Sequence, residues 1–507
     1  MGYAISIFNV LLLCINVVFG ISEKANATSD LDYSIVQIDG ASLNVPTPQL
    51  PDVSIYKEEW IKQKIPASSK SIVSVIPMHK ELSLHKFLQK EKMHEWVERQ
   101  GKLPQIIKIE SGVITIPELF DELKDEMLMA REGNVYTLRV PLVIGKRANL
   151  VVSGDEVASM RMSEGRGSFI VNNGHVYFYG TQLVGWNESQ GTPSYYKNKD
   201  EFRPFFLAWN ASKSYFFETV VKSLGYAASK SYGLSISHNI KLNDQGFSGV
   251  HPTAWIVDST FVDMYFGFYS YEADDVVLLR NVYEDNIVYG IDPHDRSTNF
   301  IIAFNEAYGT KEKHGIIISR EVNDSWVFNN FSHDNHGSGF MIDRNSVRNV
   351  FANNLSLGNG GDGYAVYESP NNLLWNNKAL SNGRHGVQVR NSTAIKVYNN
   401  TLADNGKYGV FGHIKTDFSG SRDLELDPFI ADVSITVSGS RVYSNKKGAI
   451  SIDSPYKINL YDLDLRYPYK QKGTYFRGVL SHFHNKIFDI IYRQKGAVAV
   501  VPHDISH

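Results

Sequence analysis

One short segment combines the residue types that proton transfer needs. It runs from Tyr289 through Asp292 and His294 to Asp295, so that a histidine stands between two aspartates and a tyrosine precedes them. A general base works best with a pKa near the working pH, and free histidine lies at about 6.5. A surface histidine in a hydrated acidic patch has the same composition. The segment is therefore a candidate catalytic centre, and its chemistry depends on the elements that position it.

The bulk composition is that of a folded protein. The chain has 507 residues, 43% hydrophobic and 21% charged, with a formal net charge of −3. Its length exceeds that of a usual domain, which predicts several domains or one elongated repeat fold. The absence of a net basic charge argues against nonspecific nucleic-acid binding. Any anionic ligand must therefore be held by local cations.

The N-terminus predicts export. A largely apolar run from Ile5 to Ile21 contains Cys14, the one cysteine, and Ala25-Asn26-Ala27 offers a small-x-small cleavage site. We predict a signal peptide over residues 1–27 and a periplasmic or secreted protein. The alternative is a single-pass anchor, the only form in which the chain would contact a membrane. A cleaved chain has no cysteine, which excludes disulfides and cysteine-ligated zinc.

Two residue types recur with a common period. Glycines at a nearly constant interval precede short apolar runs; they are Gly267, Gly290, Gly315, Gly339, Gly363, Gly386 and Gly409, and their numbers differ by 23, 25, 24, 24, 23 and 23. A column of asparagines accompanies them; these are Asn281, Asn305, Asn329, Asn353, Asn376 and Asn399, and their numbers differ by 24, 24, 24, 23 and 23. Such a period, with two or three short strands per repeat, predicts an all-β parallel β-helix. We expect the asparagines to stack at coil corners.

The remaining segments are predicted to cover the ends of this solenoid. We assign residues 28–135 to a leader and N-terminal cap, 136–466 to the β-helix and 467–507 to a C-terminal capping segment. Residues 28–68 are rich in Pro, Ser and Asp and are expected to form a mobile leader or an irregular strap. Residues 85–100 and 116–131 show helical patterns, and the second has an apolar side. We expect these helices to cap the first coil, because terminal repeats of a solenoid need covering.

The period also predicts which side chains face outward. The first and third positions after each ladder glycine are almost all apolar and are expected inside, which sends Asp292 and His294 outward together. Equivalent positions of stacked coils form columns about 4.8 Å apart. The fifth-position column contains Asp295, Arg320 and Arg344, so Arg320 is expected beside the candidate centre. An outer face of this kind can hold an extended polymer.

Three stretches resemble a known family. Residues 289–297 (YGIDPHDRS), 313–315 (KHG) and 319–325 (SREVNDS) look like the periplasmic mannuronan C5-epimerases of alginate biosynthesis. Further similarity lies at residues 136–144, 231–239 and 256–273, so the likeness extends over roughly residues 136–390. The resemblance implies a right-handed parallel β-helix and conversion of D-mannuronate to L-guluronate within a polymer.

The resemblance also implies roles for single residues. His294 would remove the C5 proton, Arg320 would neutralise the substrate carboxylate, Asp292 would orient the site, and Tyr289 would act at the opposite face, where a water is the alternative. The substrate-binding residues are predicted to be Asp295, Lys313, His314, Asn323, Asp324, Arg344 and Arg390. The expected ligand is an anionic polysaccharide, and an export complex is a candidate partner.

No cofactor or metal site is predicted from the sequence. Asp274 and Asp275 resemble calcium ligands, but the nonapeptide array of calcium-binding β-helices is missing, so they are expected to cap a turn. Three other functions stay open. A polysaccharide lyase would use the same base and arginine, a hydrolase would use two carboxylates about 5–9.5 Å apart, and a β-helix can bind carbohydrate without catalysis.

Overall fold

The computed structural model describes residues 33–88, 92–228, 230–244, 246, 249–417, 425, 427–465 and 475–503. The predicted signal peptide, residues 1–27, lies outside this part of the chain. Within it, no helix is both long enough and apolar enough to cross a membrane.

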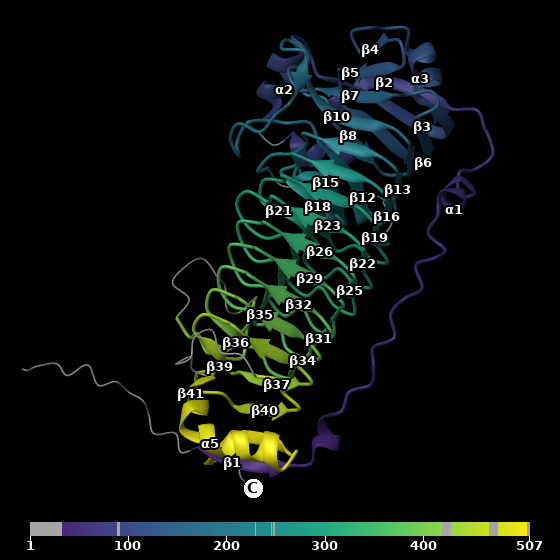
Figure 1. The fold of residues 1–507 in the computed structure, drawn as a ribbon. Coiled ribbons are helices and arrows are strands. Elements are labelled where there is room, and N and C mark those ends of the chain that lie inside the picture. The colour runs from purple at the N-terminus through teal and green to yellow at the C-terminus, as the bar shows by residue number, and fades with distance from the viewer. Residues whose placement is uncertain are drawn as a thin grey trace, which may run out of the picture.

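The chain winds into a stack of coils with three short strands in each coil (Figure 1). One coil, for example, contains β21 (Tyr289–Asp292), β22 (Ile301–Ala303) and β23 (Glu306–Tyr308), and each strand pairs in parallel with its equivalents in the coils before and after. Short strands suit this winding because backbone groups pair between coils rather than within one. The predicted parallel β-helix is confirmed.

The first ladder carries the ladder glycines and the candidate centre. Its strands are β8 (Ile170–Asn172), β12 (Phe206–Trp209), β15 (Gly233–Ser237), β18 (Phe266–Tyr271), β21, β24 (Ile316–Ser319), β27 (Phe340–Asp343), β30 (Tyr364–Tyr367), β33 (Val387–Arg390), β36 (Tyr408–His413), β39 (Gly448–Ile452) and β41 (Phe476–Gly478).

The second ladder follows the first around each coil. Its strands are β9 (His175–Tyr179), β13 (Lys213–Phe217), β16 (Thr253–Val257), β19 (Val277–Leu279), β22, β25 (Trp326–Phe328), β28 (Val350–Ala352), β31 (Leu373–Trp375), β34 (Ile395–Tyr398), β37 (Ser434–Ser438) and β40 (Lys457–Tyr461).

The third ladder closes each coil. Its strands are β5 (Val135–Leu138), β7 (Ser159–Ser163), β10 (Gln182–Asn187), β14 (Val220–Lys222), β17 (Thr260–Val262), β20 (Val282–Glu284), β23, β26 (Phe331–His333), β29 (Leu355–Leu357), β32 (Lys378–Leu380), β35 (Thr401–Ala403) and β38 (Arg441–Tyr443). The short β11 (Thr192–Pro193) pairs antiparallel with β10.

The apolar columns line the interior, as the spacing predicts. Ile291, Ile316 and Ile318 have no exposed surface, and the equivalent residues of later coils are equally buried. Burying apolar surface is worth about 25 cal/mol per Å², so the columns stabilise every coil against the next. Some outward second positions are covered as well, because Ile317, which is 3% exposed, and Met341 pack together on the outer side.

The asparagine ladder is real, but part of the predicted register is wrong. The buried, stacked residues are Asn281, Asn305, Asn330, Asn354, Asn377 and Asn400. Asn329, Asn353, Asn376 and Asn399 instead precede them in the left-handed backbone conformation, with φ between 51° and 58°. The coil that follows Asn305 is one position longer than the coil before it. The constant spacing assumed from the sequence therefore fell one residue short and selected the turn residue Asn329 instead of Asn330. The buried column favours asparagine because its amide pairs with buried backbone groups, and the turn column favours it because asparagine tolerates the left-handed conformation.

The N-terminal end differs in detail from the predicted helices. It contains β2 (Ile72–Pro77), η2 (Met78–Lys80), η3 (Leu82–Phe87), α2 (Lys92–Gln100), β3 (Gln105–Thr115), α3 (Ile116–Leu123), β4 (Met129–Glu132) and β6 (Leu142–Ser153). The pattern over residues 116–131 overestimates the helix, since α3 ends where Lys124 turns left-handed (φ 49°) and residues 129–132 pair with β5. Parallel pairing begins with β3 and β6, ahead of residue 136.

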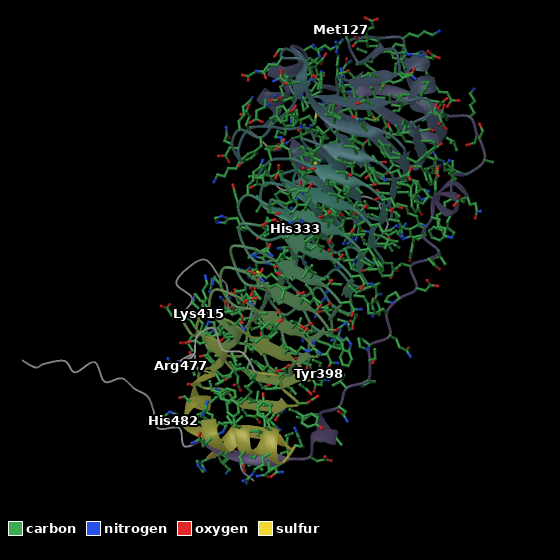
Figure 2. The ribbon with its side chains drawn as sticks, viewed as in Figure 1. Met127, His333, Tyr398, Lys415, Arg477 and His482 are labelled. Carbon is green, nitrogen blue, oxygen red and sulfur yellow. The ribbon has the colours of Figure 1, made fainter. Side chains whose placement is uncertain are left out.

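The leader forms a strap along the outside of the coils (Figure 1). It starts at β1 (Tyr33–Ile38) and passes through η1 (Gly40–Leu43) and α1 (Glu58–Lys62). The strap is tied along its length: the hydroxyl of Tyr398, labelled in Figure 2, donates to the Leu43 carbonyl at 2.6 Å, and Trp60 stacks on Trp255 at 3.8 Å. The alternative of an irregular strap thus fits residues 33–66.

The C-terminal end is closed by segments from both ends of the chain. η4 (Val479–Phe483), α5 (His484–Phe488) and the single π-helical turn η5 (Asp489–Arg493) follow β41, and β42 (Ala497–Pro502) pairs antiparallel with β40 and with β1. The edge of the last coil is therefore covered by pairing rather than left open.

Candidate active site

The end of β21 presents the candidate centre on the outer side of the first ladder. His294 bridges Ser319 of the next coil, and its backbone N–H donates to the Ser270 hydroxyl at 3.3 Å. Its ring nitrogen Nδ1 hydrogen-bonds the Asp295 carboxylate, and its side chain is 20% exposed. A carboxylate only accepts, so Nδ1 donates and Nε2 keeps its lone pair. The histidine is therefore held in the tautomer that can take a proton at Nε2.

Asp295 lies where the strand ends, in a column of left-handed turn residues. Its φ is 40°, and Arg320 (φ 62°) and Arg344 (φ 52°) are its equivalents on the next two coils. Burial acts to raise the pKa of Asp295, but the His294 hydrogen bond and the charges of His294, Arg320 and Lys230 outweigh it, so the pKa lies below its ordinary value. Asp295 is thus an ionised partner for the imidazole.

Arg320 lies beside this pair, as the spacing predicts. Its Nη1 is 3.8 Å from Asp295 Oδ1, and its side chain remains 47% exposed. A contact at that distance leaves the planar guanidinium free to bind another carboxylate with two hydrogen bonds. The arginine therefore has both a structural ion pair and an open side toward solvent.

Asp292 is buried, which the sequence did not predict. Alternation puts it on the outer side of β21, yet it is 1% exposed, because it lies in register with Tyr269 on the preceding coil. Oδ1 has no hydrogen-bond partner among the residues that the structure describes. Burial raises the pKa of Asp292 to about 7, His294 acts against the rise and Asp295 acts with it. Near neutral pH a large fraction of this carboxyl is uncharged.

Tyr289 starts β21 and is packed into an aromatic column. Its ring stacks on His314 at 5.9 Å and meets Phe266 edge-on at 5.1 Å. Lys313 donates from Nζ to the Tyr289 hydroxyl at 3.2 Å. Burial raises the pKa of Tyr289, and the Asp292 carboxylate acts in the same direction. The phenol therefore stays protonated at neutral pH.

Lys313 and His314 differ in what they can offer an anion. Lys313 is exposed and lies 5.3 Å above the Tyr289 ring. His314 accepts the Ser338 backbone N–H at Nδ1, 2.9 Å away, and burial lowers its pKa to about 4. His314 is thus uncharged at neutral pH, so it can donate a hydrogen bond but adds no charge for a carboxylate.

The other predicted binding residues are already engaged. Arg390 makes two hydrogen bonds to the buried Glu368, at 2.7 and 3.2 Å. Arg344 lies 3.7 Å from Asp343 and 3.6 Å from Asp427.

Asn323 and Asp324 belong to the turn after β24 rather than to the candidate centre. Asn323 Oδ1 accepts from Val347 N–H at 2.8 Å, and Asp324 pairs with Arg348 at 2.6 Å. These contacts favour turn capping for both residues over substrate binding. Both residues were predicted as substrate-binding because they lie in the stretch 319–325 that resembles the family. After β24, however, the chain turns toward the second ladder.

Lys230 is a neighbour of the centre that the sequence did not single out. It is buried, donates from Nζ to the Tyr269 hydroxyl at 3.3 Å and lies 3.1 Å above the ring of Tyr271. Burial lowers the pKa of Lys230 to about 6, and the charge of Lys86 acts in the same direction. In the sequence, the one indication that Lys230 could lie near the site was its position directly before residues 231–239, a stretch that resembles the family.

A cavity of about 650 Å³ adjoins these residues. It is lined by Lys86 and Lys230 and by Tyr271, Glu272 and Arg296 of the coils that carry the centre, together with His238. Arg296 donates from Nε to Glu272 Oε1 at 2.8 Å. Lys86 and Arg296 thus bring positive charge to a space large enough for a sugar residue, whereas Lys230, with its pKa of about 6, is largely uncharged at neutral pH.

Comparisons with known proteins agree with this arrangement. A family model described as a right-handed β-helix region matches residues 295–419. A mannuronan C5-epimerase of Pseudomonas putida is 42% identical over 471 residues, which cover 93% of this chain and 91% of the relative. The mannuronan C5-epimerase AlgG of Azotobacter vinelandii is 41% identical over 475 residues, covering 94% and 90%.

The chain belongs to the mannuronan C5-epimerase family. The crystal structure of the periplasmic alginate epimerase AlgG matches with a TM-score of 0.81 and 43% identity, over 83% of this chain and all of that one. The right-handed parallel β-helix and the family resemblance predicted from the sequence are thereby confirmed. In this member of the epimerase family, His294, Asp295 and Arg320 lie together at the end of the first ladder's strands.

Proposed function

We propose that this chain converts D-mannuronate residues to L-guluronate within an intact anionic polysaccharide, in the periplasm. One arrangement carries the proposal: a solvent-accessible histidine whose Nδ1 is held by Asp295, with the guanidinium of Arg320 beside that carboxylate. Epimerisation at C5 needs a base for the C5 proton and a cation for the adjacent carboxylate. The family membership supports the substrate and the location.

The first half of the reaction removes the C5 proton. That proton is weakly acidic, because its loss places a second negative charge on a group that already carries a carboxylate. His294 takes the proton at Nε2, and the ionised Asp295 stabilises the imidazolium that forms. Arg320 binds the substrate carboxylate, where the charge develops, which is the largest available stabilisation.

Asp292 assists in its uncharged form. An uncharged carboxyl buried beneath the centre adds no negative charge, whereas an ionised one would repel the substrate carboxylate above it. The raised pKa of Asp292, to about 7, makes that form available near neutral pH. Its buried Oδ1 is also free to accept a hydrogen bond.

The second half returns a proton to the opposite face of C5. Tyr289 is the proton donor that we favour, since its hydroxyl is protonated and Lys313, 3.2 Å away, stabilises the phenolate that donation would leave. The lysine can then pass a proton back. A water molecule is the alternative donor.

Neighbouring sugars are held by the cations around the centre. Lys313 is exposed and near Tyr289, and Lys86 and Arg296 line the adjoining cavity. Arg296 is paired with Glu272 but its side chain stays 50% exposed, whereas that of Arg390 is 19% exposed in its pair with Glu368, so Lys313, Lys86 and Arg296 are better placed for substrate carboxylates. Polymer binding would therefore weaken as salt is added.

The proposal is tested by incubating the protein with polymannuronate and following proton NMR. We expect guluronate signals without any shortening of the chain. Unsaturated, ultraviolet-absorbing ends would mean a lyase, new reducing ends a hydrolase, and unchanged polymer a binding protein; each of these results contradicts the proposal. The variant His294→Ala should keep its fold and its polymer binding and lose epimerisation, whereas His333→Ala, on the third ladder (Figure 2), should behave as the parent.

A further inference from the structure

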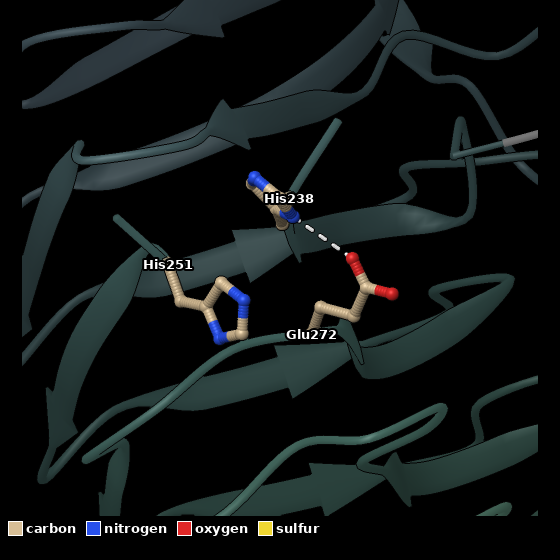
Figure 3. A group of neighbouring side chains, drawn as sticks. All are labelled: His238, His251 and Glu272. Carbon is tan, nitrogen blue, oxygen red and sulfur yellow. Dashed lines mark hydrogen bonds and ion pairs between the residues drawn. The ribbon is translucent and has the colours of Figure 1, made fainter. Parts of the chain in front are cut away.

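Three metal-ligating side chains meet beside the cavity, outside the proposed catalytic residues. His238 follows β15, His251 lies between α4 (Ile240–Asn243) and β16, and Glu272 follows β18 (Figure 3). One ligand atom from each lies within 4.8 Å of the others. His238 Nδ1 is 2.8 Å from Glu272 Oε2, and the two imidazole rings are 4.8 Å apart.

Two of the three have a second contact that fixes their direction. His251 Nδ1 hydrogen-bonds Asp274 Oδ2 at 2.8 Å, which leaves Nε2 for another partner. Glu272 Oε1 is taken by Arg296, which leaves Oε2 on the side of the histidines. A histidine whose other nitrogen is held by a carboxylate is the usual arrangement around a protein-bound metal ion.

We propose that His238, His251 and Glu272 bind one divalent transition-metal ion of the Zn²⁺ class. Two imidazoles and one carboxylate suit zinc, whereas calcium and magnesium prefer oxygen ligands alone. Three protein ligands leave a fourth position for water, and the cavity that His238 and Glu272 line provides the space for it.

Binding requires a small contraction of the cluster. Zinc–nitrogen and zinc–oxygen bonds of about 2.0–2.2 Å set neighbouring ligands roughly 3.4 Å apart on a tetrahedral ion. His251 therefore moves inward by about an ångström, and it can do so because it belongs to a connecting segment and is 32% exposed. If His238 binds the metal through Nδ1, the nitrogen that faces Glu272, its Nε2 carries the ring proton. Nε2 lies 3.3 Å from Asn243 Nδ2, and rotation of that amide would turn the Asn243 oxygen toward Nε2 as an acceptor.

The site is distinct from the proposed catalytic centre, although it is close to it. Glu272 donates its backbone N–H to the Asp295 carbonyl at 2.8 Å, so the two lie on adjacent coils. Neither histidine of the cluster belongs to the proposed proton-transfer set. The inference therefore does not depend on the epimerase proposal, and its test needs no substrate.

The experiment measures metal binding by the whole chain, produced without a polyhistidine tag and stripped with a chelator. Titration with Co²⁺ should give one equivalent with the visible absorption bands of a four-coordinate site, and Zn²⁺ should displace it. His251→Ala should abolish the bands, and Asp274→Asn should weaken binding by about 10–100-fold.

His333→Ala is the matched control. His333 also contacts two carboxylates, Glu306 at 3.0 Å and Asp334 at 2.8 Å, but through opposite ring nitrogens, so the three cannot share one ion. This variant should bind cobalt as the parent does. Circular dichroism identifies any variant that fails to fold, and His251→Gln then replaces His251→Ala. A parent protein that binds no cobalt at micromolar concentration, or equal binding by the parent and the folded His251 variant, would overturn the proposal.

Discussion

Arg320 Nη1 lies 3.8 Å from Asp295 Oδ1, while Oδ2 of the same carboxylate accepts from His294. Asp295 therefore links the proposed base to the proposed cation across two coils. Asp295 and Arg320 both lie at the left-handed turn that follows the strand, with φ of 40° and 62°. Backbone pairing between coils, rather than the side chains themselves, fixes the spacing.

Replacing Arg320 by alanine should lower kcat about 100–1000-fold, because it removes the cation that faces the developing charge. Arg320→Lys should recover part of this loss, since it restores charge but not the two-pronged geometry. The measurement is the initial rate of guluronate formation by NMR. Arg348→Ala, which removes an arginine paired with Asp324 at 2.6 Å, is the control and should keep the parental rate. Equal rates for Arg320→Ala and Arg348→Ala would remove Arg320 from the mechanism.

Tyr289→Phe separates the two halves of the reaction. His294 should still remove the C5 proton, but no donor would stand on the opposite face. In D₂O we expect deuterium to enter C5 of residues that remain mannuronate, while guluronate formation falls about 100-fold or more, the effect of a lost general acid. Tyr367→Phe is the control, as a tyrosine of the same ladder. Parental inversion by Tyr289→Phe would assign the returning proton to water.

Asp292 should make the protein less stable as the pH rises. Its folded pKa of about 7 lies above the ordinary value of 3.8, so the folded state binds an extra proton between these limits. The stability this proton contributes is complete below pH 3.8 and is lost as the pH passes through about 7, by about 1.4 kcal/mol per unit within the window. The free energy of unfolding in urea should fall between pH 5 and pH 8 in the parent, and this fall should be smaller by roughly 3 kcal/mol in Asp292→Asn. Identical declines would contradict the raised pKa.

The asparagine ladder provides a stability test with neighbouring residues. Asn330 Nδ2 donates to the Ile302 carbonyl at 2.8 Å and its Oδ1 accepts from Asn305 N–H at 2.9 Å. Asn330→Ala leaves these buried groups unpaired and should cost about 2–4 kcal/mol in the free energy of unfolding. Asn329→Ala removes only the preference for a left-handed turn and should cost about 1 kcal/mol. Thermal and urea unfolding compare the two, and equal losses would mean that the ladder hydrogen bonds add nothing.

The sequence by itself determined the fold and the core of the candidate site. A regular period specifies stacked coils, because residues one period apart occupy the same place on successive coils. The alternation after each ladder glycine then specifies which residues face inward. His294 and Asp295 are consecutive, and Arg320 holds the position of Asp295 one coil later, so their proximity follows from the period alone.

Tertiary structure decided what breaks the period and what covers the surface. One extra position in a coil shifted the buried asparagine from 329 to 330, and the longer interval between Gly233 and Gly267 brings His251 beside His238 and Glu272. Burial depends on the size of side chains on neighbouring coils, so Asp292 is enclosed although it faces outward. Ion pairing depends on competition among nearby charges, so Arg390 is taken by Glu368 while Arg320 stays open. A repeat fixes positions along the stack, whereas solvent exposure and charge pairing depend on contacts that no single coil contains.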